Sequence, residues 1–141
     1  MPFIHIKLAG MDLTDTQRLA LQAGMTDRMA RLMAKQAELT AVLVERLDVS
    51  GWSIGAAPVP VAAHVDAFVT AGTNDEKQKL AFIGNVHDLL RELCGAGLPL
   101  ATYVIVHEVP ASDWGYGGQT QAARRNGWKA EDGNNPNAFT R

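Results

Sequence analysis

Apolar and polar positions along the chain alternate with two different periods. Residues 3–9 (FIHIKLA) and 64–71 (HVDAFVTA) alternate in the way that half-buried strands do. Residues 39–47 (LTAVLVERL) and 100–109 (LATYVIVHEV) have the character of further strands. Between the strands of each pair, apolar residues recur at helical spacing: Leu21, Met25, Met29, Leu32 and Met33, then Phe82, Val86, Leu89, Leu90 and Leu93. The pattern predicts strand, helix and strand, twice over, with the methionines as core packing.

The same order of features returns after 62 residues. At this shift Gly10 falls on Gly72, Trp52 on Trp114, and Pro2 on His64. We predict one domain made of two β-α-β repeats, 2–56 and 64–118. The proline-containing segment 57–63 is the expected linker, and the polar residues 126–141 are an expected arm or partly disordered tail.

Each predicted helix begins with a capping-box pattern. Thr14 precedes Gln17 by three positions, and Thr73 precedes Glu76 by the same spacing. We therefore expect the first helix to begin after Thr14 and the second after Thr73.

Two β-α-β units predict an α/β (α+β) fold, a four-stranded sheet with two helices on one face. The opposite face stays uncovered, and its side chains are expected to include Phe3, His5, Lys7, Ala41, Leu43, Tyr103 and Ile105. A largely apolar face without helices predicts association between subunits.

Composition and net charge argue against some classes of binding partner. The 141 residues are 47% hydrophobic and carry a net charge of −2, which argues against nucleic acid and anionic membrane surfaces as partners. We expect no signal peptide or membrane helix. Cys94 is the sole cysteine, interpreted as a small buried apolar residue, so a reducing cytoplasmic location is expected. The histidines lack metal-ligand spacing, and no metal is expected.

Pro2 is the main candidate for chemistry. If Met1 is removed, the chain begins with a secondary amine. An amine becomes a base near neutral pH when desolvation or a neighbouring cation lowers its pKa. Such a base can take a proton alpha to a carbonyl and return it elsewhere, which is keto–enol tautomerisation.

In its opening PFIHIKLAG, its capped helix, its strand ELTAVLV and its turns GWSIGA and DWGYGG, the chain resembles the tautomerase superfamily, whose type member is 4-oxalocrotonate tautomerase. It looks like a fused form with two copies of the short subunit. The resemblance implies a trimer with no cofactor, Pro2 as general base, and a small 2-oxo acid or enol as substrate. Trp52 and Trp114 match the aromatic residue of the family's final turn and would form an apolar wall. His64, matched to Pro2, offers no amine, so one active site per chain is expected.

The arginines that bind the substrate carboxylate in the type enzyme are absent. Met11 and Thr73 stand where the first would be, and neither second strand supplies the other. Other polar candidates for the site are Lys7, Arg46, Tyr103, His107, Arg124 and Arg125, and two of them are singled out. Tyr103 is either a hydrogen-bond donor to an enolate or an interface aromatic, and Arg124 is either a carboxylate ligand or a surface residue. His107 is interpreted as part of a solvated strand end.

Two alternatives stay open. A protonated Pro2 would act as a general acid in hydratase, dehalogenase or decarboxylase chemistry, as relatives in the superfamily do. A chain that keeps Met1 would have no basic Pro2 nitrogen and would be a non-catalytic oligomeric binding protein.

Overall fold

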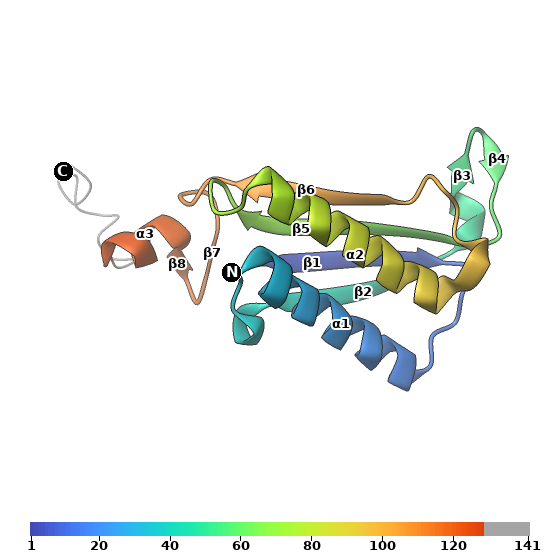
Figure 1. The fold of residues 1–141 in the computed structure, drawn as a ribbon, viewed down its shortest axis with the longest axis horizontal. Helices are drawn as coiled ribbons and strands as arrows, with labels where there is room; N and C mark the ends of the chain where they lie inside the picture. Colours follow the sequence, from blue (N-terminus) through green and yellow to red (C-terminus); the bar gives the residue numbers. More distant parts are fainter. Residues whose placement is uncertain (129–141) are drawn as a thin grey trace.

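The computed structural model describes residues 1–128 and confirms the predicted repeat of strand, helix and strand (Figure 1). The first repeat contains β1 (Phe3–Ala9), α1 (Asp15–Met33) and β2 (Ala41–Leu47). The second contains β5 (Ala62–Thr70), α2 (Glu76–Cys94) and β6 (Tyr103–Val109). The remaining elements are short: η1 (Ala37–Leu39), η2 (Val49–Gly51), β3 (Ser53–Ile54), β4 (Ala57–Pro58), η3 (Gly95–Gly97), β7 (Gly115–Tyr116), β8 (Gln119–Thr120) and α3 (Gln121–Asn126).

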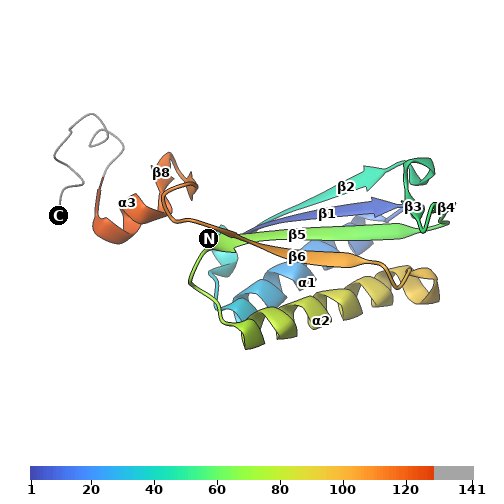
Figure 2. The same cartoon turned by 90° about the horizontal axis from the view of Figure 1, so that it is seen from above.

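The four long strands form one sheet in the order β2-β1-β5-β6. Within each repeat the two strands are parallel, and the repeats meet where β1 runs antiparallel to β5. Phe3 pairs with Ala41 on one side and with Phe68 on the other. Both long helices cover the same face of the sheet, as predicted, and the opposite face is open (Figure 2).

The core lies between the sheet and the two helices. Its residues are completely or almost completely buried: Ile4, Ile6, Leu8, Leu21, Met25, Met29, Met33, Val65, Ala67, Val69, Phe82, Val86 and Leu90. The interpretation of the methionine stripe as core packing is thus confirmed. The helices approach closely at Gly24, where an added Cβ would lie 2.9 Å from a methyl carbon of Leu89.

The caps correct the alignment of the repeats. Thr14 and Gln17 form the predicted capping box, but the second box is made by Asp75 and Gln78. The predicted second box, with Thr73 as its cap, is wrong. These caps superpose at a shift of 61 residues rather than 62.

The same correction of one residue changes which residue of the second repeat is equivalent to Pro2. Along β1 the even-numbered residues Ile4, Ile6 and Leu8 face the core, whereas along β5 the odd-numbered residues do. The buried position that corresponds to Pro2 is therefore Ala63, and the assignment of His64 to it is wrong. The second strands still superpose at 62, so the extra residue lies between α2 and β6.

Short hairpins extend the two ends of the sheet. The β3–β4 hairpin lies at one end, and the arm of β7, β8 and α3 lies at the other, beside the amino terminus (Figure 1). The expected linker 57–63 contains β4 and the first residues of β5. Most of the expected tail, 129–141, lies outside the described residues. Among residues 1–128, no helix has the length and apolar character needed to cross a membrane.

Candidate active site

The amino terminus lies at the end of the sheet where β5 and β6 finish. Pro2 is buried, and its carbonyl accepts a hydrogen bond of 3.3 Å from the amide of Ala41. Because Phe3 pairs with Phe68 on an antiparallel strand, Thr70 lies level with the start of the chain. Two neighbouring strands therefore fix the position of the amino terminus.

Lys35 reaches the same place from the carboxyl end of α1. The helix ends at Met33, and Ala34 adopts a left-handed conformation with φ of 55°, which redirects the chain. The Lys35 ammonium then donates a hydrogen bond of 2.7 Å to the hydroxyl of Thr73, in the loop between β5 and α2. This places a cation beside the amino-terminal nitrogen.

The surroundings favour a neutral amine at the amino terminus. Desolvation by partial burial, and secondly the charge of Lys35, lower the pKa of the Met1 amine. Desolvation also lowers the pKa of Lys35. An α-amine ordinarily has a lower pKa than a lysine ammonium.

Trp114 approaches this end from the loop after β6. Its indole Nε1 donates a hydrogen bond of 3.2 Å to the hydroxyl of Thr70, a residue that is only 5% exposed. The Thr70 carbonyl in turn accepts a hydrogen bond of 2.6 Å from the hydroxyl of Thr73. Trp114, Thr70, Thr73 and Lys35 thus form one hydrogen-bonded chain at the end of the sheet that holds the amino terminus.

Trp52 and Tyr103 lie away from this end within one chain. Trp52 follows β2, which runs parallel to β1, so it lies at the opposite end of the sheet. Tyr103 pairs with His64, about 13 Å along the strands from Phe68. It is 65% exposed on the open face of the sheet. Of the predicted aromatic site residues, only Trp114 is brought to the amino terminus of its own chain.

Arg124 lies in the arm that carries Trp114. Its guanidinium donates a hydrogen bond of 2.8 Å to the Tyr116 carbonyl and stacks 3.8 Å from the centroid of the Tyr116 ring. The amide of Gln121, at the start of α3, donates a hydrogen bond of 2.9 Å to the carbonyl of Trp114. Arg124 therefore braces the turn beside Trp114, and its role as a carboxylate ligand stays a prediction.

The open face carries more polar groups than the sequence analysis expected. His64 and His107 both contact the carboxylate of Asp66, at 3.0 Å and 2.6 Å. Burial alone would raise the pKa of Asp66, but the hydrogen bonds and charges of the two histidines outweigh it and hold that pKa below its usual range. The ring of His107 also stacks on Phe68, with centroids 4.5 Å apart. His107 is thus part of a packed network, which corrects its interpretation as a solvated strand end.

Sequence reasoning missed Lys35 and Thr70. Both come together only when the turn at Ala34 and the antiparallel pairing of β1 with β5 are known. The positive-φ residue at the helix end leaves no trace in the sequence, because alanine rarely adopts that conformation. Among the described residues, no cluster of three or more His, Cys, Asp or Glu side chains could hold a metal ion.

Comparisons with known proteins agree with this architecture. The family model described as tautomerase enzyme matches residues 62–124, which contain the second repeat. No curated protein sequence matches the chain.

Several solved structures share the fold over most of the chain. An asymmetric trimer of wild-type fused 4-OT, designated R7, has a TM-score of 0.76 and 25% identity, covering 87% of this chain and 98% of its own. Native fused 4-OT has a TM-score of 0.75 and 24% identity, covering 86% and 97%. A macrophage migration inhibitory factor-like protein from Entamoeba histolytica has a TM-score of 0.68 and 19% identity, covering 84% and 97%.

The family match and the fold agree with the sequence resemblance. The structural match covers nearly the whole of the fused neighbours' chains. Residues 62–124 thus match the tautomerase family, and the chain as a whole has the fold of the fused 4-OT structures.

Proposed function

We propose that this protein is a cofactor-independent keto–enol tautomerase that acts on a small 2-oxo acid or its enol. Removal of Met1 exposes the Pro2 amine, which is the general base. One observation carries the proposal: desolvation and the charge of Lys35 lower the pKa of the Met1 amine, and Pro2 is the next residue of the chain. An amine held neutral near physiological pH is what proton transfer by the terminus requires.

The proposed reaction moves one proton. The neutral Pro2 nitrogen takes the proton of the enol hydroxyl, and the oxygen becomes a carbonyl as the electrons of the carbon–carbon double bond shift. The resulting ammonium returns the proton to carbon, so the amine is regenerated and no oxidant or reductant is needed. Trp114 would shield the amine from water, which keeps it weakly solvated and basic.

Lys35 is the proposed ligand of the substrate carboxylate. Thr73 directly follows the glycine after which the resemblance predicts an arginine, and it is the residue to which Lys35 donates its hydrogen bond. The carboxyl end of α1 therefore brings a cation to the place that the loop after β5 leaves without one. An ammonium binds a carboxylate as a point charge, so we expect looser orientation than a bidentate arginine gives.

The active unit is proposed to be a homotrimer joined through the open sheet face. Several of the fused 4-OT neighbours are trimers. Several large apolar side chains on this face are exposed in the single chain, among them Leu43, Tyr103 and Ile105. In a trimer, Tyr103 would be brought to the site of another subunit, where it could serve the role predicted for it.

The base role is favoured over the acid role. Desolvation and a neighbouring cation both disfavour a protonated amine, whereas hydratase or dehalogenase chemistry would need that amine to stay protonated. The experiment has two steps. Intact mass of the purified protein should lack one methionine, and Pro2→Ala should abolish turnover of phenylenolpyruvate and 2-hydroxymuconate. Undiminished turnover by Pro2→Ala would eliminate the proposal, and retained Met1 would favour a binding protein.

A further inference from the structure

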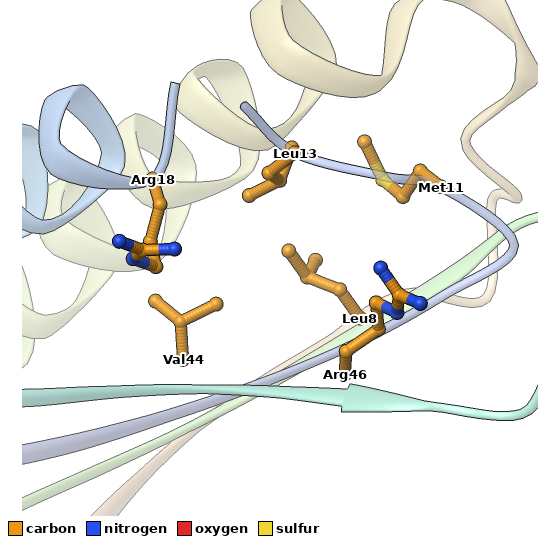
Figure 3. A pocket seen from close by; sticks show the side chains of 6 residues that line it. All are labelled: Leu8, Met11, Leu13, Arg18, Val44 and Arg46. Atoms are coloured by element: carbon orange, nitrogen blue, oxygen red, sulfur yellow. The ribbon is translucent and has the colours of Figure 1, made fainter. Parts of the chain in front are cut away.

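A pocket lies in the first repeat, at the end of the sheet opposite to the amino terminus. It has a volume of about 260 Å³ and opens between α1, the end of β1 and the edge strand β2 (Figure 3). It is lined by Leu8, Met11, Leu13, Arg18, Val44 and Arg46. None of these residues belongs to the candidate active site.

Two arginines flank an apolar interior. Arg18 points from α1 toward the sheet and Arg46 points from β2 toward the loop, with apolar side chains between them (Figure 3). Arg18 contacts Asp15 at 3.1 Å and Arg46 contacts Asp12 at 2.6 Å. The two aspartates are 87% and 84% exposed, so these ion pairs are weak and exchangeable.

The second repeat has a different arrangement at the matching positions. The shift of 61 residues takes Arg18 on α1 to Lys79 on α2, and the shift of 62 takes Arg46 on β2 to Glu108 on β6. Lys79 and Glu108 form an ion pair of 2.7 Å. In the second repeat, a cation and an anion thus join helix to strand, whereas the first repeat has a cation at both places. An anion bound between the two arginines would take the place of the exposed aspartates with which they pair.

The interior of the pocket is apolar and suits the apolar part of a small anionic ligand. Leu8 is 1% exposed and forms the floor, and Met11 is held by a contact of 3.2 Å between its sulfur and that of Cys94. The volume is below that of typical drug-sized pockets, so it suits a tail of a few carbons and excludes a nucleotide.

We propose that this pocket binds a small monocarboxylate with a short apolar tail. The carboxylate lies between Arg18 and Arg46, which exchange their exposed aspartates for it. The tail lies against Leu8, Met11 and Leu13. The site is separate from the amino-terminal site, and it does not depend on the proposed tautomerase activity.

The test uses hexanoate as the probe and the methionine methyl groups as reporters. Protein labelled with ¹³C at these methyl groups is titrated with hexanoate at constant pH and ionic strength. The Met11 resonance should shift saturably, whereas Met25, Met29 and Met33, which are fully buried in the core, should stay in place. Acetate, which lacks the tail, should bind more weakly, and hexylamine, which reverses the charge, should not bind.

Substitutions test whether the two arginines bind the carboxylate of hexanoate. Arg18→Gln and Arg46→Glu should each raise the Kd for hexanoate about tenfold or more, because each removes a charge-assisted hydrogen bond. Asp12→Asn should lower the Kd, since it frees Arg46 from its partner. Arg31→Gln is the matched control, because Arg31 lies on the same helix in a similarly exposed pair with Asp27. It should leave the Kd within about twofold.

Three results would overturn the proposal: no saturable shift of Met11, equal binding of hexylamine, or equal weakening by Arg31→Gln and Arg46→Glu. The core methionine resonances show whether each variant is folded. If Arg46→Glu fails to fold, Arg46→Gln takes its place with the same expected loss.

Discussion

Lys35 and Thr73 are 38 residues apart in the chain, and a hydrogen bond of 2.7 Å joins the ammonium of one to the hydroxyl of the other. Thr73 directly follows Gly72, and the family resemblance predicts a carboxylate-binding arginine after this glycine. We propose that Lys35 supplies this charge from a different element of the fold, and its charge lowers the pKa of the Met1 amine.

Replacing Lys35 should affect both binding and proton transfer. We expect Lys35→Met to raise KM about tenfold or more, because a substrate carboxylate loses its ionic partner. The acidic limb of the kcat/KM profile should move to higher pH, since the charge that lowers the amine pKa is gone. Lys35→Arg should restore much of both. Steady-state kinetics across pH measures these effects, and an unchanged profile in Lys35→Met would contradict the role.

Trp114 should keep the amine poorly solvated. Trp114→Ala admits water, so the amine pKa should rise toward its ordinary value and kcat/KM at neutral pH should fall, because desolvation is the larger cause of the lowered pKa. Trp114→Phe removes only the hydrogen bond to Thr70 and should have a smaller effect. Trp52→Ala is the control from the opposite end of the sheet. Equal shifts in the pH profiles of both alanine variants would show that Trp114 has no special position.

Asp66 should contribute a pH-dependent part of the folding stability. Its pKa is lowered in the folded chain, so its contribution is present above the ordinary pKa of an aspartate and is lost as the pH falls through the folded value. We expect Asp66→Asn to reduce the free energy of unfolding by about 1–3 kcal/mol at pH 7, because two hydrogen bonds to a carboxylate are weakened. Urea unfolding at several pH values checks this. A difference that persists unchanged under strongly acidic conditions would contradict it.

Asp75 should stabilise the start of α2. Its side chain accepts a hydrogen bond of 2.8 Å from the amide of Gln78, so Asp75→Ala should cost about 1 kcal/mol. Asp75→Ser, which keeps a capping oxygen, should lose much less. Thr14→Ala at the start of α1 should cost about as much as Asp75→Ala. Thermal unfolding measures all three, and a neutral Asp75→Ala would show that the cap is unimportant.

The fold was largely predictable because periodicity reports which side of each element is buried. The alternation at 3–9 and the helical spacing from Leu21 to Met33 depend on local geometry, and both elements formed as expected. The alignment of the repeats was less reliable. The glycines and tryptophans that recur in both repeats indicated a shift of 62. The alternation of buried residues along the first strands and the capping residues of the helices require a shift of 61 across the first strand and helix of each repeat.

The site was only partly predictable, because it depends on contacts between distant segments. Pro2 and Trp114 were predicted as site residues from position and motif. Lys35 was not, since its approach depends on the left-handed turn at Ala34. The contacts of Asp66 with His64 and His107 depend on the register of β5 and β6, which no local pattern specifies.

The most direct test of the central claim is the pKa of the Pro2 amine, measured by ¹⁵N NMR titration of protein that has lost Met1. The proposed mechanism predicts a value well below the ordinary value for a secondary α-amine, so that the base is neutral at physiological pH. A value at or above the ordinary one would contradict the base role, whatever the fold.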